Sequence, residues 1–298
     1  MKQLILILFL FFFSPLSQAL TFSKLGGTFL IRGEIEKGDF HAFLKKFAEW
    51  ERAPTVFEID SPGGDLNEAI EIGSFIRKSQ IPVWVWNECS SACVFIYASA
   101  VERYVKGKIG LHRPYFDSKY FSSLTSSEAE SKYNELKLNA SLYLKHAGVK
   151  QNIIHKMFST SSKDIHYISG DDANKEFGVI SDFYEEWIIS KCGAYTTAEQ
   201  KVITSIGDLN AARMTAVAMQ DQNIDKADDF GSNLEELWNG AQLALELDRN
   251  GMLQPYAEKL EKRSRCIDKS TNAHILEWHL VLKENLVEVL EELNTLSR

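Results

Sequence analysis

The segment Thr55-Val-Phe-Glu-Ile-Asp-Ser-Pro-Gly-Gly64 is the most informative part of the chain about its architecture. Its first five residues are mostly β-branched or apolar, which is typical of a strand, and the Ser-Pro-Gly-Gly that follows ends this strand in a turn. From Asn67 to Lys78 the apolar residues recur with a helical period. The sequence therefore predicts a strand, a tight turn and a helix in succession, which is the first part of a βαβ unit.

Strands and helices continue to alternate on both sides of this stretch. Further helices are predicted at 38–50 and 92–98, and further strands at 28–31, 82–86, 108–111 and 178–180. Ser127 and Glu130 have the spacing of a capping box, which predicts the start of another helix. Helices between consecutive strands favour repeated βαβ units with a largely parallel sheet. We therefore predict an α/β domain over residues 25–190.

The C-terminal third shows a different pattern, because no convincing strand follows residue 192. Thr196 and Glu199 again have the spacing of a capping box. A long final helix is predicted by an apolar stripe made of Leu276, Leu280, Val287, Leu290 and Leu293. We expect residues 195–298 to form an all-helical C-terminal domain.

The first residues have the pattern of an export signal. Lys2 precedes an apolar run of ten residues from Leu4 to Phe13, and the small residues around Ser17 and Ala19 suit signal peptidase. An uncleaved membrane anchor is the alternative, but a bilayer span needs about 20 apolar residues. We predict that residues 1–19 are a signal peptide and that the mature protein is periplasmic or secreted, with no membrane span.

The composition is that of an ordinary globular protein. The 298 residues are 45% hydrophobic and 25% charged, which excludes a disordered chain. Lys and Arg number 33 against 41 Asp and Glu, and this net charge of −8 does not favour nucleic acid as a partner. We expect no nucleic acid, no cofactor and no metal ion.

Export makes the four cysteines candidates for disulfides. Cys192 and Cys266 lie on two segments with helical patterns, and a bridge between them would cross-link the C-terminal half. Cys89 and Cys93 are only four residues apart, so their pairing depends on the local backbone. A zinc site made of Cys89, Cys93 and His112 is the alternative, although it lacks an obvious fourth ligand.

Two turns carry groups that could hold a developing negative charge. Gly63-Gly64 lets the backbone turn its amides outward, where they can stabilise an oxyanion. In Asn87-Glu-Cys-Ser-Ser-Ala-Cys93 a serine stands between a strand and an apolar helix, and the N-terminus of a helix favours negative charge. The alternatives are that the glycine pair is only a turn, and that Ser90 or Ser91 merely caps the helix.

A histidine follows the next predicted strand. It lies in Leu111-His-Arg-Pro114, 21 positions beyond Ser91. Histidine is the usual general base for a serine nucleophile. A purely structural histidine is the alternative, because the mature chain contains six others.

Taken together, these segments resemble the Clp peptidase, the proteolytic subunit of the ATP-dependent Clp protease, and the wider Clp/crotonase superfamily, over about residues 27–188. Ile59–Gly64 contains the Ser-Pro-Gly-Gly motif of this family, and Ser91 falls where the family has its nucleophile. His112-Arg-Pro is similar to the family's His-Gln-Pro, and Ile168–Asp182 is similar to its late Leu-Ser to Gly-Leu-Val-Asp element. The chain resembles in particular a group of exported Clp-peptidase-like proteins with Cys-x-Ser-Ala-Cys around the serine.

The resemblance implies roles for individual residues. Ser91 would be the nucleophile and His112 the general base, and the amides of Gly64 and Ala92 would form the oxyanion hole. The acid that orients the histidine lies just before the Leu-Ser element in the family, which favours Asp164. Asp171 and Asp172 are the alternatives for this acid, and Asp60 is expected to be structural.

The chain departs from the family pattern around the serine. Cys89-Ser90 replaces Ala-Ala, and Cys93 replaces a glycine, so a Cys89–Cys93 disulfide would either rigidify or distort the nucleophile turn. A relative of signal-peptide peptidase, with Lys106 or Lys108 as the base, is a further alternative, and a coenzyme A thioester enzyme is less favoured still.

These inferences lead to one expected function and one principal alternative. We expect an exported serine peptidase that hydrolyses peptides or unfolded polypeptide by a Ser-His-Asp mechanism, with a homo-oligomer as a candidate state. Because exported compartments lack ATP, no ATP-driven unfoldase is expected as its partner. The alternative is a catalytically inactive binding or scaffold protein with the same fold.

Overall fold

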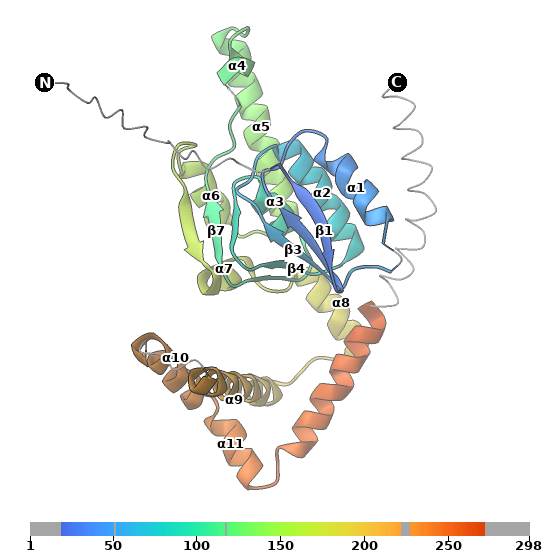
Figure 1. The fold of residues 1–298 in the computed structure, drawn as a ribbon, viewed down its shortest axis with the longest axis vertical. Coiled ribbons are helices and arrows are strands. Elements are labelled where there is room, and N and C mark those ends of the chain that lie inside the picture. Colours follow the sequence, from blue (N-terminus) through green and yellow to red (C-terminus); the bar gives the residue numbers. More distant parts are fainter. Residues whose placement is uncertain (1–18, 51, 117, 222–226, 272–298) are drawn as a thin grey trace, which may run out of the picture. The chain divides into compact units, whose positions relative to one another are not determined.

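The computed structural model describes residues 19–50, 52–116, 118–221 and 227–271. The chain divides into two units, one of residues 1–182 with 275–298 and the other of residues 183–274 (Figure 1). The predicted signal peptide, apart from its last residue, and the predicted stripe from Leu276 to Leu293 lie outside the described residues.

The first unit is built on two β-sheets. The larger sheet has the order β1-β2-β3-β4-β6, with β1 at Thr21–Leu25, β2 at Thr28–Arg32, β3 at Val56–Asp60, β4 at Val83–Val85 and β6 at Arg103–Val105. β1 is antiparallel to β2, and the other neighbours are parallel. The smaller sheet has the order β5-β7-β8, with β5 at Glu88–Ser90, β7 at Lys108–Leu111 and β8 at His166–Ser169. The predicted α/β class with parallel strands is confirmed.

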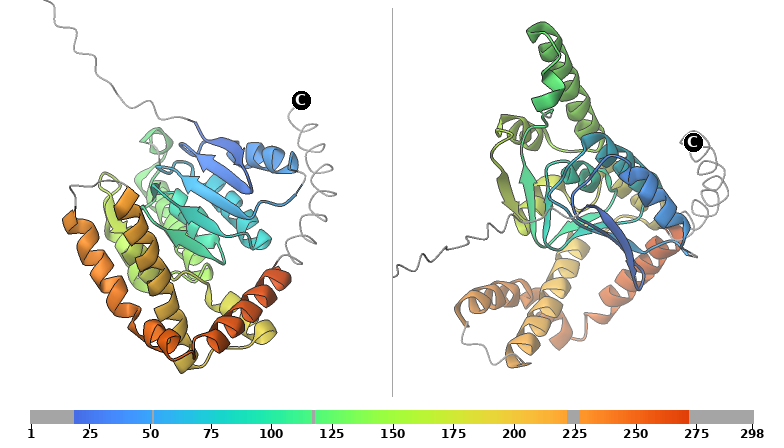
Figure 2. Two further views of the ribbon diagram at one scale, coloured as in Figure 1. Left: turned by 60° about the horizontal axis from the view of Figure 1, so that its bottom comes forward. Right: turned by 45° about the horizontal axis from the view of Figure 1, so that its top comes forward.

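Helices connect these strands and cover them. The helices of the first unit are α1 at Asp39–Ala48, α2 at Leu66–Ser79, α3 at Cys93–Ser99, α4 at Ser118–Phe121, α5 at Ser126–His146, α6 at Gln151–Ser159 and α7 at Gly170–Phe177. α1 joins β2 to β3 and α2 joins β3 to β4, and the two helices lie side by side (Figure 1, Figure 2). The end of α5 that adjoins α4 projects away from both sheets (Figure 1, Figure 2).

The core of this unit is aromatic between the large sheet and its helices. The ring of Phe43 in α1 lies 5.4 Å from Phe29 of β2, 5.9 Å from Phe57 of β3 and 5.0 Å from Phe75 of α2, measured between centroids. All seven residues of α3 are buried. This packing fixes the helix that directly follows the candidate nucleophile.

A buried arginine holds the other end of α3. Arg103 is 1% exposed, and its guanidinium donates to the carbonyl oxygens of Ala98, Phe177 and Gly178. These carbonyls lie at the C-terminal ends of α3 and α7, where the helix dipole favours a positive charge. Arg103 therefore links the C-terminal ends of α3 and α7 through their backbone carbonyls.

Three sequence-based expectations for this unit need correction. α5 is capped by Thr125 and Glu128 rather than by Ser127 and Glu130, because the chain enters the helix two residues earlier. Residues 178–180 form no strand, and only Ile180 makes a bridge, with Glu102. Four strands, β1, β5, β6 and β8, lie outside the predicted ones, since each is a short strand at a sheet edge with few β-branched residues.

Helices and the short loops between them make up the described residues of the second unit. It contains α8 from Asp182 to Cys192, α9 at Thr197–Asp221, α10 at Ala227–Gly240, α11 at Gln242–Arg249 and a helix over 254–271. The predicted capping box is present, since Thr196 Oγ1 accepts from the Glu199 amide and Glu199 accepts from the Thr196 amide. A disulfide joins Cys192 to Cys266.

Among the described residues, none of the helices is both long enough and apolar enough to cross a lipid bilayer.

Candidate active site

A pocket of about 840 Å³ lies where four strands of the first unit end. Its walls come from the segments that follow the C-terminal ends of β2, β3, β5 and β7, and from α5. The carboxyl ends of parallel strands are the usual place for a ligand site in α/β proteins. Ser91 and His112 line this pocket, together with Gly63, Gly64 and Ala92.

Glycine is required at positions 63 and 64, because other parts of the chain lie too close there to admit a Cβ atom. Gly63 has φ +105°, and a Cβ atom there would lie 2.5 Å from the Cβ atom of Ser91. Gly64 has φ +137°, and a Cβ atom there would lie 2.0 Å from the carbonyl oxygen of Ile35. Other residues resist both the angles and the contacts. The turn after β3 is thereby packed directly against the turn that carries Ser91.

Ser91 occupies a strained backbone position. Its φ is +56°, in the left-handed region that L-residues seldom adopt, and its amide donates to the carbonyl of Gly110 at 2.9 Å. The N-cap of α3 is Ala92, with no side-chain cap, and the Ser90 hydroxyl binds Glu88 instead. The alternative in which Ser90 or Ser91 caps this helix is therefore wrong.

The two amides assigned to the oxyanion hole lie beside this serine. Gly64 and Ala92 both line the pocket, and neither amide donates a hydrogen bond to another described residue. Free amides that converge on a pocket can stabilise a developing negative charge. Their arrangement suits an oxyanion next to the Ser91 hydroxyl.

His112 is 8% exposed at the wall of the pocket. Its Nδ1 lies 3.1 Å from the carbonyl oxygen of Arg113. A proton on Nδ1 can be donated to this oxygen, which leaves Nε2 as the acceptor that a general base needs. No hydrogen bond joins the ring to the Ser91 hydroxyl in this structure, although both groups line the same pocket.

The carboxylates considered as the triad acid lie elsewhere. Asp164 is exposed and does not line the pocket. Asp172 accepts from the Ser169 hydroxyl, Asp171 lies beside it in the first turn of α7, and Asp60 accepts from the side chain of Asn87. Within the described part of the chain, no carboxylate forms a hydrogen bond or ion pair with the His112 ring. The Arg113 carbonyl is the polar group within hydrogen-bond distance of the ring.

The remaining wall of the pocket combines aromatic and charged side chains. Phe116 and Tyr120 stack with their centroids 4.4 Å apart, and Tyr115 is 60% exposed. On α5, Lys132 forms an ion pair with Glu135 at 3.1 Å. This wall offers apolar contact area as well as polar partners to a ligand.

The cysteines beside the serine are joined to each other. A disulfide links Cys89 of β5 to Cys93 of α3, and both residues are fully buried. Their sulfur atoms are therefore not available to a metal ion, which removes the zinc alternative. Over the described ranges, no group of three His, Cys, Asp or Glu side chains is placed to hold a metal.

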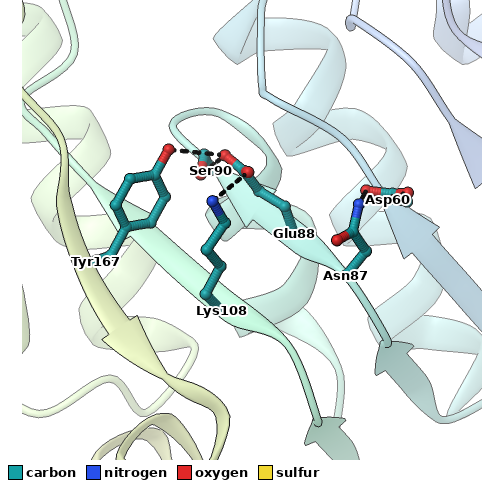
Figure 3. Close-up of polar contacts among 6 residues, drawn as sticks. All are labelled: Asp60, Asn87, Glu88, Ser90, Lys108 and Tyr167. Carbon is teal, nitrogen blue, oxygen red and sulfur yellow. Dashed lines mark hydrogen bonds and ion pairs between the residues drawn. The ribbon is translucent and has the colours of Figure 1, made fainter.

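The lysines considered as an alternative base do not reach the pocket. Lys106 lies over the ring of Trp86, 5.4 Å from its centroid. Lys108 forms an ion pair with Glu88 at 2.9 Å, in a polar cluster that also contains Ser90 and Tyr167 (Figure 3). Sequence reasoning missed this cluster, because its members come from three strands and share no local pattern.

The charge of Glu88 is favoured by this cluster. Burial raises the pKa of its carboxyl, but hydrogen bonds from Lys108, Ser90 and Tyr167 outweigh burial and hold the pKa below its usual value of 4.5. Glu88 is therefore an anion at neutral pH.

Comparisons with known proteins give similar solved structures but no sequence match. No protein-family model matches the chain, and no curated protein matches it significantly. Among solved structures, an asparagine-to-aspartate mutant of ClpP1 from Listeria monocytogenes is similar, with 20% identity and a TM-score of 0.40. The similarity covers 51% of this chain and 88% of the other. A likeness of this extent carries no argument about activity.

Proposed function

We propose that the protein is an exported serine peptidase of the Clp-peptidase-like kind, with Ser91 as nucleophile and His112 as general base. The observation that carries this proposal is the pocket in which a strained serine, a histidine with Nδ1 at a backbone carbonyl and two free amides meet. The substrate class is a peptide or a segment of unfolded polypeptide. No cofactor takes part.

The reaction follows the chemistry of acyl transfer. Ser91 Oγ attacks the scissile carbonyl carbon while His112 Nε2 takes the hydroxyl proton, and the amides of Gly64 and Ala92 hold the oxyanion. The tetrahedral intermediate collapses by breaking the C–N bond, and His112 gives its proton to the leaving amine. Water then attacks the acyl-enzyme by the same route and releases the acid and free Ser91.

The group that orients His112 is a separate question. The motif pattern assigns this role to Asp164, whereas the carbonyl of Arg113 is the polar group on the ring in this structure. We propose Asp164 as the acid to test first, through Asp164→Asn. A large loss of acylation rate would support Asp164, and an unchanged rate would assign orientation to the Arg113 carbonyl.

The proposal also includes the location of the protein and its action without an ATP-driven partner. The N-terminal sequence has the pattern of a signal peptide, and two disulfides are compatible with an oxidising compartment. In such a compartment the peptidase acts without an ATP-driven partner. Assembly into a homo-oligomer is part of the proposal and is tested by the mass of the purified protein in solution.

Labelling by a fluorophosphonate tests the proposed nucleophile. The purified protein should label at one site, Ser91→Ala should abolish the labelling, and His112→Gln should slow it by about 100-fold, the usual range for losing a general base. Ser23→Ala, which removes an exposed hydroxyl on β1, is the matched control and should label normally. Folded wild-type protein that never labels would refute the peptidase.

A non-catalytic binding protein is the second candidate. It is favoured by the missing hydrogen bond between Ser91 and His112 and by the Cys89–Cys93 disulfide beside the serine. In this case the pocket would bind peptides without turnover. Equal peptide binding by the wild type and Ser91→Ala, with no labelling of either, would support this candidate.

A further inference from the structure

A polar cluster lies on the strand that leads into Ser91 (Figure 3). Its centre is the Glu88 carboxylate, which accepts hydrogen bonds from Ser90 Oγ at 2.7 Å and from the Tyr167 hydroxyl at 3.1 Å. Its other oxygen pairs with Lys108 Nζ at 2.9 Å. The ammonium of Lys108 also lies 4.0 Å from the centroid of the Tyr167 ring. Three strands are thus joined through one carboxylate.

The cluster occupies a single face of the smaller sheet. Glu88 pairs with Lys108, Ser90 pairs with Gly110, and Gly110 pairs with Tyr167. Because side chains alternate along a strand, these residues share one face, and Cys89 points to the other. None of Glu88, Ser90, Lys108 or Tyr167 lines the pocket. The cluster can therefore act on the site only through the backbone.

Ser90 and Ser91 contact the same glycine. Ser90 is fully buried, and a Cβ atom on Gly110 would lie 2.1 Å from its Oγ. The carbonyl of Gly110 accepts the amide of Ser91. The hydroxyl that binds Glu88 therefore packs on the residue that anchors the Ser91 backbone.

This contact helps to hold the strained backbone of Ser91. A serine at φ +56° persists only where its surroundings determine the backbone. Ser90 cannot itself be the nucleophile, because it is fully buried and donates its proton to a carboxylate. Its hydroxyl instead fixes the residue immediately before the strained one.

We propose that Glu88 and Ser90 are positioning residues that hold Ser91 in its reactive backbone geometry from the face of the sheet away from Cys89. This inference rests on the proposed function. Without the Ser90 hydroxyl, Glu88 loses a donor and space opens over Gly110, so the turn can relax away from its left-handed conformation. The attack by Ser91 then slows, whereas ligand binding is unchanged because the walls of the pocket are intact.

The rate constants of fluorophosphonate labelling test this assignment. Labelling forms a bond between Ser91 Oγ and phosphorus and expels fluoride with the hydroxyl proton. For Ser90→Ala we expect the maximal rate, kinact, to fall about tenfold, less than the roughly 100-fold that a misplacement of about 1 Å can cost. KI should stay within about twofold of wild type. Glu88→Ala should lower kinact to a similar extent, again with little change in KI. Glu88→Gln keeps an acceptor for Ser90 and Tyr167 and should retain most of the rate.

Ser99→Ala is the matched control. Ser99 is also a buried serine in a hydrogen bond, donating to the carbonyl of Phe95 at 2.7 Å within α3. It should lower the melting temperature without changing kinact. Equal kinact in Ser90→Ala and wild type, or equal losses in Ser90→Ala and Ser99→Ala, would overturn the positioning role alone. A wild type that does not label would overturn the proposed function and this inference together.

Discussion

The two units of the chain are stabilised in different ways. In the first unit a large continuous core includes fully buried Phe29, Phe43 and Phe57 and the six apolar residues of α3. In the second, the separate cluster found among described residues consists of Leu209, Ala241 and Ala244 with a few half-buried neighbours. The strained Ser91 turn thus lies in the unit with the deep core, and the Cys192–Cys266 cross-link joins two helices of the other unit.

The two disulfides differ in sequence separation and in burial. Cys89 and Cys93 are four residues apart and fully buried, beside the candidate nucleophile. Cys192 and Cys266 are 74 residues apart and partly exposed. Because a longer closed loop restricts the unfolded chain more, the second bridge should contribute more to stability. The Cys89–Cys93 bridge should matter more for the reactivity of Ser91, because it lies beside this residue.

The largest effect should come from removing the long-range bridge. Replacing both Cys192 and Cys266 by alanine should destabilise the helical unit by about 4 kcal/mol in the chain-entropy model. Helical circular dichroism should then be lost at a lower temperature than labelling of Ser91. Loss of both signals in one transition at the lower temperature would contradict the separation between the units.

The next effect concerns the glycine turn. Gly64→Ala should destabilise the first unit by about 3 kcal/mol and abolish labelling, because its Cβ would meet the Ile35 carbonyl and its backbone angle is unfavourable. Gly148→Ala is the matched control, with φ +81° and no atom within 4 Å of its Cβ position. It should destabilise by about 1 kcal/mol and leave labelling intact. Chemical denaturation of both variants measures the difference.

A smaller effect is expected from the local bridge. Replacing Cys89 and Cys93 by alanine should lower the free energy of unfolding by about 2 kcal/mol, because the closed loop is short. Labelling of Ser91 should slow, since its turn is held at both ends by this bridge.

Treatment with a mild reductant compares the two disulfides without mutation. The partly exposed Cys192–Cys266 bridge should open first, and labelling should continue while Cys89–Cys93 remains buried and intact. Alkylation and mass analysis identify the reduced pair. Reduction of Cys89–Cys93 before the other pair would contradict the difference in burial.

The smallest effect is a pH dependence in the first unit. Because Glu88 has a lowered pKa in the folded state, its contribution to stability is complete above about pH 4.5 and is lost as the pH falls through the lowered value. Glu88→Gln should be less stable than wild type at neutral pH, and the two should converge on acidification. The free energy of unfolding of both proteins is measured by urea unfolding at several pH values. A constant difference between them at all pH values would show that the interactions of the Glu88 carboxylate do not stabilise the fold.

Local patterns predicted the central part of the fold closely. The strand expected at 55–59 is β3 at Val56–Asp60, and the helix expected from Asn67 to Lys78 is α2 at Leu66–Ser79. The strand has a run of β-branched and apolar residues, the helix has a clear apolar period, and the Gly63-Gly64 turn separates the two. β5, in contrast, is Glu88-Cys-Ser, which has no strand pattern of its own. It is a strand because β7 pairs with it, and such pairing is not visible in a short segment.

Short-range patterns in the sequence are enough to predict the alternation of strands and helices, the glycine turn and the residue types on which the proposed chemistry depends. Hydrogen bonding and burial within a few residues control these features, so a single segment shows them. In contrast, it is only in the folded chain that Ser91 and His112 line one pocket and that a backbone carbonyl, rather than Asp164, lies at the histidine ring. These placements follow from the pairing of β5 with β7, which brings segments 20 residues apart into register, as Ser90 with Gly110.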